Sequence, residues 1–95
     1  MSNIINKEIL INASSIIEQK KDIGFFNRVW STDVSVYIDR IKSLGMYNLY
    51  SVLDAGCGYG QWTYPLALLN EKVLAIDVDK NRIEVVNQII RKTKC

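Results

Sequence analysis

The sequence predicts an α/β fold in which two N-terminal helices precede a strand, a helix, a second strand and a final helix, with the two strands parallel. Three observations support this prediction. Apolar residues recur at helical spacing in the first half of the chain, two short apolar runs occupy residues 50–55 and 73–77, and a cluster of glycines follows the first run directly. A right-handed crossover between two parallel strands is the expected connection for such an order.

The composition is that of a folded chain. Hydrophobic residues make up 48% of the sequence and charged residues 23%. Disordered proteins are less hydrophobic, so this composition excludes a disordered chain. The formal net charge of +2 is too small, and too scattered, to indicate binding to nucleic acid or to an anionic membrane. A single domain with a thin core is expected for a chain of 95 residues.

No feature of the sequence indicates a membrane or a metal. Residues 1–20 mix polar and charged residues with apolar ones and lack the pattern of a secretory signal. No apolar run approaches the roughly 20 residues that a membrane-spanning helix needs. The chain has two cysteines and no histidine, so a zinc site lacks a plausible set of ligands. We therefore expect a cytoplasmic protein without a metal.

Residues 1–48 are predicted to form a helical lead-in. Residues 4–21 carry an apolar stripe at helical spacing, which predicts one continuous helix, and a break is expected at 22–26. The stripe consists of Ile5, Ile9, Ala13, Ile16 and Ile17.

A second helix is predicted after residues 31–33, which offer a serine, a threonine and an aspartate as possible N-caps. Gly45 follows its last apolar residue, in the position where a left-handed C-terminal cap favours glycine. The predicted apolar stripe is Val34, Tyr37, Ile38, Ile41 and Leu44.

Residues 49–95 are predicted to form a β-α-β-α unit. Residues 50–55 and 73–77 are the two expected buried parallel strands. Pro65 fits the first turn of the helix between them, where its missing N–H has no intrahelical partner to lose. Asp79 is the expected N-cap of the final helix. We expect Trp62, Leu66 and Leu69 to face the sheet, and Ile83, Val86 and Ile90 to form the inner stripe of the final helix.

The strand at 50–55 runs into a turn with glycine at 56, 58 and 60, a geometry that brings backbone N–H groups close to a ligand. Asp77 ends the next strand, where a carboxylate can accept hydrogen bonds from both hydroxyls of a ribose. Such a carboxylate can instead cap a helix, and Asp54 beside the turn can instead bond the backbone N–H groups of the turn. Both readings remain open at the level of sequence.

Two cofactor classes fit this pattern. The dinucleotide fingerprint places its third glycine at the position that Gln61 occupies here, so NAD is disfavoured. Asp54 would repel a pyrophosphate and attract the cationic amino group and sulfonium of S-adenosylmethionine. The charge at the turn therefore favours the methyl donor.

These residues resemble a known family. Residues 52–60, with the sequence VLDAGCGYG, resemble motif I of the class I (Rossmann-like) S-adenosylmethionine-dependent methyltransferases, and residues 73–77 resemble their second motif. The resemblance implies an N-terminal portion of that fold. It implies that the turn wraps the methionine moiety, that Asp54 reaches the methionine amino group and that Asp77 holds the ribose. The cofactor-binding residues it implies are Asp54, Gly56, Cys57, Gly58, Gly60, Asp77 and Val78.

The resemblance also implies what this chain lacks. Such enzymes continue with further strands that hold the adenine and face the methyl group, so we expect a single, truncated domain over residues 1–95. We expect a methyltransferase as the parent protein, weak cofactor binding and no turnover by this chain alone, and we nominate no catalytic residue. The methyl acceptor is unknown, with a small molecule favoured.

Alternatives from other classes remain. A non-catalytic cofactor-binding or interaction module could complete its sheet with another chain, because a strand at 50–55 without a second neighbour invites edge pairing and self-association. An NAD-type Rossmann fragment is a weaker alternative. Cys57 lies between two glycines without a histidine base and is expected to be a packing residue. The aromatic residues Phe25, Phe26, Trp30 and Tyr37 are expected to be core more often than a lid over a cofactor.

Overall fold

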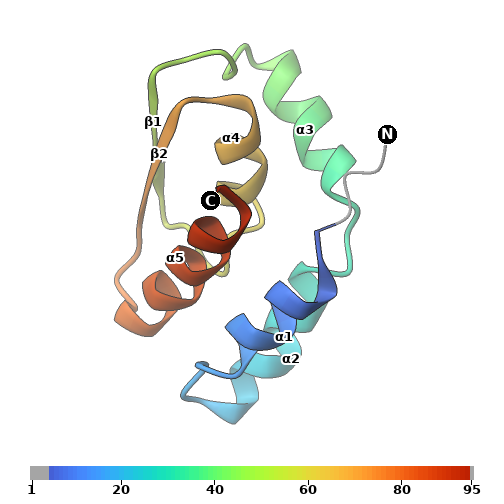
Figure 1. The fold of residues 1–95 in the computed structure, drawn as a ribbon, viewed down its shortest axis with the longest axis vertical. Helices are drawn as coiled ribbons and strands as arrows, with labels where there is room; N and C mark the ends of the chain where they lie inside the picture. The colour runs from blue at the N-terminus through green and yellow to red at the C-terminus, as the bar shows by residue number, and fades with distance from the viewer. Residues whose placement is uncertain (1–4, 95) are drawn as a thin grey trace.

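A computed structural model describes residues 5–94, apart from the side chain of Lys94. Its elements follow the predicted order, with one additional helix near the N-terminus (Figure 1). They are α1 (Lys7–Ser14), α2 (Lys20–Val29), α3 (Val34–Ser43), β1 (Ser51–Ala55), α4 (Thr63–Leu69), β2 (Lys72–Ile76) and α5 (Lys80–Lys94).

The two strands pair in parallel, which confirms the predicted α/β unit. In their register Ser51 lies opposite Lys72 and Ala55 lies opposite Ile76. The crossover between them is α4, and Pro65 is the third residue of that helix, in its first turn as predicted. Both strands therefore deliver their carboxyl ends to the same edge of the sheet, where the glycine turn and Asp77 follow.

Only one face of the sheet is covered, so the prediction of fully buried strands is wrong. Exposed and partly buried residues alternate along both strands. On the open face Leu53 is 57% exposed and its register partner Leu74 is 63% exposed. In Figure 1 helices α1 to α4 lie to one side of the strand pair, and α4 and α5 both contact β2. In the described part of the chain, the helices that pack on the sheet, α4 and α5, thus cover the same face.

The N-terminal region forms two short helices instead of the one that was predicted over 4–21. α1 begins after the N-cap Asn6, whose side chain accepts a hydrogen bond from the backbone of Glu8. The helix ends at two serines whose hydroxyls bond carbonyl oxygens three residues back, at 2.7 and 2.6 Å. Serine hydroxyls compete with helical hydrogen bonds in this way, which favours a break. The predicted break at 22–26 lies inside α2 and is also wrong.

Helix α3 begins and ends as the sequence predicts. Asp33 is its N-cap, accepting a hydrogen bond from the backbone of Ser35 at 2.9 Å. Gly45 adopts a φ of +74°, as a left-handed cap requires. Val34 and Ile41 are buried, whereas Leu44 at the end of the predicted stripe is 70% exposed.

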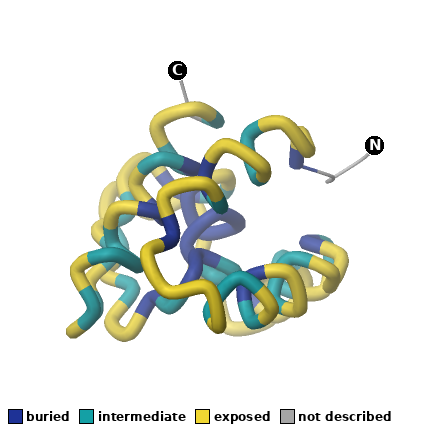
Figure 2. Tube along the Cα trace, turned by 90° about the horizontal axis from the view of Figure 1, so that it is seen from below, coloured by how far each residue is buried: buried dark blue, intermediate teal, exposed yellow. Residues whose placement is uncertain are grey.

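The core joins the two ends of the chain, because α1 packs against α5. Figure 2 shows that the buried positions gather near the centre of the molecule and that most of the outer trace is exposed. Asn81 at the start of α5 strengthens this junction by donating to the carbonyl of Ile16 at 2.9 Å and accepting from the backbone of Glu18 at 3.0 Å.

The buried stripe of α5 differs from the predicted one. It consists of Val85, Val86 and Ile89, whereas Ile83 and Ile90 are only partly buried. Trp62 also departs from its prediction: it precedes α4, and its ring lies 4.7 Å from the ring of Tyr37 on α3, centroid to centroid. Leu66 is buried as expected, and Leu69 is partly buried.

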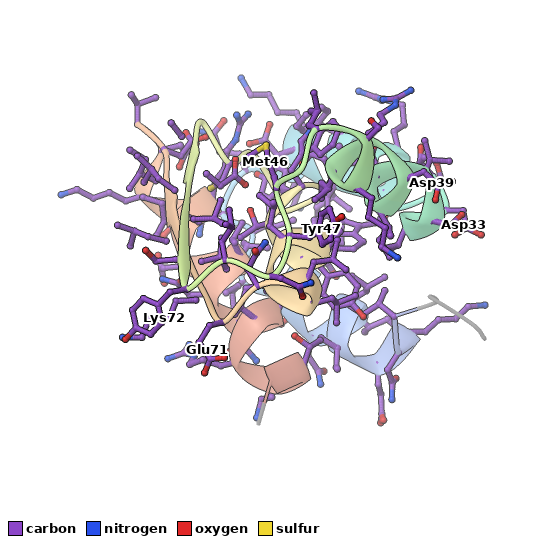
Figure 3. All side chains as sticks on the ribbon, turned by 90° about the horizontal axis from the view of Figure 1, so that it is seen from above. Asp33, Asp39, Met46, Tyr47, Glu71 and Lys72 are labelled. Carbon is purple, nitrogen blue, oxygen red and sulfur yellow. The ribbon has the colours of Figure 1, made fainter. Side chains whose placement is uncertain are left out.

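A buried asparagine organises the amino ends of the strands. The side chain of Asn70 accepts from the backbone of Leu49 at 2.8 Å and donates to the carbonyls of Met46 and Leu66, each at 3.0 Å. Figure 3 shows Met46 and Tyr47, before β1, at the same end of the molecule as Glu71 and Lys72, at the entry to β2. Asn70 thus fastens the connection before β1 to the end of α4.

No helix in residues 5–94 is both long enough and apolar enough to cross a membrane.

Candidate functional site: the glycine turn and its carboxylates

The glycine turn leaves β1 and is tied back to β2 through its backbone. The N–H groups of Gly56 and Cys57 both donate to the carbonyl of Ile76, at 2.8 and 3.0 Å. Gly56, Gly58 and Gly60 have positive φ angles of 72°, 57° and 92°. An L-residue with a side chain rarely adopts such angles, which explains the choice of glycine at these positions.

The first and third glycines differ in their surroundings. A Cβ built on Gly56 meets no atom within 4 Å, so the turn opens there onto free space that a ligand can enter. A Cβ on Gly60 would lie 3.4 Å from Val86 and 3.6 Å from the ring of Trp30. Gly60 therefore serves the packing of the turn against α5 and the C-cap of α2, whereas Gly56 lies at the open side.

Asp77 lies at the mouth of the turn. Its carboxylate accepts the N–H of Gly58 at 3.0 Å and the N–H of Asp79 at 3.0 Å. The hydrogen bond from Asp79, followed by that from Gly58 and the charge of Arg82, lowers the pKa of Asp77 despite partial burial. The turn and the acid of the second strand thus meet, and Asp77 is ionised and oriented at neutral pH.

Asp54 lies on the covered side of β1 and does not bond the turn. Its carboxylate accepts the hydroxyl of Thr63 at 2.6 Å, and Thr63 is fully buried in the first turn of α4. The sequence left open whether Asp54 bonds the backbone N–H groups of the turn. In the structure Asp77 makes that kind of bond, and Asp54 accepts from a side chain. Sequence reasoning missed Thr63, although a threonine at a helix start is a common hydrogen-bonding residue.

The negative charges of Asp54 and Asp77 both affect the thiol of Cys57, in the glycine turn. Burial, followed by the negative charges of Asp77 and Asp54, raises the pKa of the Cys57 thiol from 9.0 to about 11. The Cys57 side chain is 2% exposed and its thiol is free. The thiol therefore stays protonated at neutral pH, in accord with a packing role, and Cys57 can meet a ligand only through its backbone.

Helix α2 holds the turn from the other side through Tyr59. The indole N–H of Trp30 donates to the carbonyl of Tyr59 at 3.0 Å, and the Tyr59 hydroxyl donates to the carboxylate of Asp22 at 2.9 Å. Tyr59 is fully buried, with its ring 5.8 Å from that of Phe25 and 5.6 Å from that of Phe26. The aromatic residues of α2 are therefore core that supports the turn, as expected.

Arg82 on α5 joins this aromatic group. Its guanidinium lies 5.5 Å from the ring centre of Phe25 and 5.2 Å from that of Tyr59, and its Nε lies 3.8 Å from the carboxylate of Asp79. Cation–π contact of this kind is favourable over partly desolvated rings. Sequence reasoning missed Arg82, because its position in the third residue of α5 says nothing about the rings it meets.

Two further residues border the site. Val78 follows Asp77 and its side chain is fully exposed, so nothing in residues 5–94 covers it. Gln61 lies under the turn, with its Oε1 3.4 Å from the position of a Cβ on Gly58. That oxygen is buried and accepts no hydrogen bond in the described structure. A buried acceptor without a donor is unfavourable, and a ligand with an N–H or O–H group would relieve it.

Comparison with known proteins adds one finding. Residues 52–95, from within β1 through α5, match the family described as "Methyltransferase domain". No curated protein and no solved structure matches the chain.

The methyltransferase domain match begins in the strand that leads to the glycine turn and includes Asp77. The resemblance that the turn carries is thereby confirmed. Parallel strands joined through α4 and followed by α5 agree with part of the Rossmann-like methyltransferase fold, as the sequence predicted. The helices α1 to α3 lie outside the matched residues.

Proposed function

We propose that this chain carries the S-adenosylmethionine-binding portion of a methyltransferase. The observation that carries the proposal is the position of Asp77, whose carboxylate stands against the N–H of Gly58 at the mouth of a turn that is free of side chains at Gly56. The same turn lies within the residues that match the methyltransferase domain. A ribose bound by Asp77 would bring the rest of the ligand over the turn.

The residues around the turn fit this cofactor. Asp77 is ionised, and a carboxylate oxygen has lone pairs left beside the one that accepts from Gly58. Asp54 supplies a second negative charge, suited to the cationic methionine amino group. Gln61 offers a buried acceptor that has no donor in the described structure. When bound, S-adenosylmethionine supplies a methyl group activated by its sulfonium; the role of this chain is to bind and orient it.

Calorimetry on the full chain with S-adenosylhomocysteine tests the proposal. We expect measurable binding, and a loss of about tenfold or more in affinity for Asp77→Ala, because hydrogen bonds to a charged group are removed. Asp39→Ala is the matched control: it deletes an exposed carboxylate on α3, which Figure 3 shows pointing away from the body of the molecule. Its affinity should equal that of the original chain.

Two results would contradict the proposal. Binding that survives Asp77→Ala unchanged would remove Asp77 from the site. Displacement of the adenosyl ligand by NAD at equal or lower concentration would favour a dinucleotide site instead, in spite of Gln61 at the position of the third dinucleotide glycine.

The two-stranded sheet, with free edges and an open apolar face, favours a second candidate function, an interaction module that completes its sheet with another polypeptide. Leu53, Leu74 and Ile76 are 57%, 63% and 43% exposed on or beside this face. Size-exclusion chromatography with light scattering separates this candidate from the first, because a monomer at all concentrations would argue against a need for partners.

A further inference from the structure

Asp54 has one hydrogen-bonding side-chain partner among the described residues, and that partner is Thr63. The hydroxyl of Thr63 donates to Oδ2 of Asp54 at 2.6 Å, within the range of a good O–H···O hydrogen bond. Thr63 has no exposed surface, so its hydroxyl has no contact with bulk water.

The placement of Thr63 is rigid. It is the first residue of α4, and the same helix start is tied to the turn, since the N–H of Tyr64 donates to the carbonyl of Gly60 at 3.0 Å. A threonine has two substituents on Cβ and few accessible rotamers in a helix. Its hydroxyl is therefore fixed relative to the strand end that carries Asp54.

We propose that Thr63 is a positioning residue that orients Asp54 toward the methionine amino group of the ligand. This inference rests on the proposed function. The hydroxyl bonds Oδ2 and restricts rotation of the carboxylate, which leaves the lone pairs of Oδ1 able to accept from a cationic group. A carboxylate held in one orientation binds such a group with less loss of side-chain freedom than one that rotates.

A pair of ligands distinguishes positioning from a general structural role. S-adenosylhomocysteine carries the amino group, whereas methylthioadenosine keeps the adenosyl part and lacks the amino acid. In the full chain, Thr63→Val removes the hydroxyl at nearly constant shape. We expect it to weaken S-adenosylhomocysteine binding about tenfold and to leave methylthioadenosine binding unchanged within about twofold. Thr63→Ser keeps a hydroxyl and should restore at least half of the lost binding free energy.

The outcomes are distinguishable. If the original chain binds S-adenosylhomocysteine and Thr63→Val binds it equally well, the positioning role is overturned while the proposed function stands. An equal loss for both ligands identifies a structural role and also overturns it. If the original chain binds neither ligand, the proposed function fails and this inference fails with it. Thr63→Ala, which also lacks the hydroxyl and favours the helix, replaces the valine variant if circular dichroism shows that the latter is unfolded.

Discussion

Asp77 should make the stability of this chain depend on pH in the acid range. Hydrogen bonds from the N–H groups of Asp79 and Gly58 lower the pKa of this carboxyl below its ordinary value of 3.8. The ionised form is thus favoured by folding, so the contribution of Asp77 is present above the unfolded-state pKa and is lost as the pH falls through the lower, folded-state pKa.

Urea unfolding between pH 2 and pH 6 checks this prediction. The free energy of unfolding should decline below about pH 4 in the original chain, and the part of that decline due to Asp77 should be missing from Asp77→Asn. Identical pH profiles for the two proteins would show that the two backbone hydrogen bonds do not favour the ionised form.

Asn70 should contribute more to the free energy of unfolding than an exposed asparagine does. Its amide bonds three backbone groups around the amino ends of the strands, and the residue is 7% exposed. Asn70→Ala removes these three hydrogen bonds, two part-buried and one buried, and should lower the free energy of unfolding by about 2 kcal/mol.

Asn87→Ala is the control for that change, because Asn87 is exposed on α5. Thermal or urea unfolding of both variants measures the difference. Equal stabilities would contradict the view that Asn70 fastens the connection before β1 to the end of α4.

At the scale of elements, α2 and the glycine turn should behave as one unit. Trp30 donates its indole N–H to the carbonyl of Tyr59 inside the turn. Trp30→Phe keeps an aromatic ring and leaves that carbonyl without its donor. We expect a loss of about 1–3 kcal/mol in the free energy of unfolding and weaker binding of S-adenosylhomocysteine, because the turn loses one of its anchors.

Trp62→Phe is the matched control, since Trp62 meets α3 through a ring contact with Tyr37. It should be the milder change for both quantities. If Trp30→Phe lowers stability yet leaves ligand affinity as it was, α2 supports the fold without shaping the turn.

Elements with strong local signals were predictable from the sequence. Asp33 and Gly45 bound α3 through local hydrogen bonding and a left-handed cap, and both lie as predicted. The split between α1 and α2 was not predictable, because the apolar pattern over 4–21 fits one helix as well as two. Hydroxyl bonds at Ser14 and Ser15, and the packing of Phe26 against Tyr59, decide it.

The candidate site also contains residues that the sequence could predict and residues that it could not. Asp54 lies near the end of β1 and Asp77 follows β2, and parallel strands bring their ends to one edge, so topology implies that the two acids are neighbours. Thr63 and Arg82 are placed by helices whose rotation about their own axes depends on tertiary packing. Val78 is the residue whose binding role remains a prediction without any contact in the described chain to support it.

At the scale of the molecule, the uncovered sheet face should promote self-association. Exposed leucines at register-paired positions of β1 and β2 form a continuous apolar surface. Leu53→Lys should therefore raise the concentration at which light scattering detects dimers or larger species, with no loss of secondary structure by circular dichroism.

Ile11→Lys is a suitable control for this change, because Ile11 on α1 is also exposed, at 64%, and lies away from the strands. Its association should match that of the original chain. Equal effects of the two lysines would mean that net charge, and not the sheet face, governs association.

The junction between α1 and α5 has a consequence for how the protein is made. Ile16 and Glu18 find their partner in Asn81, far along the chain, and α1 finds its packing surface on α5. On the ribosome, α1 emerges before α5 and lacks this packing surface until α5 has left the exit tunnel. The packing of α1 therefore waits for α5, and the apolar stripe of α1 stays exposed to water until then.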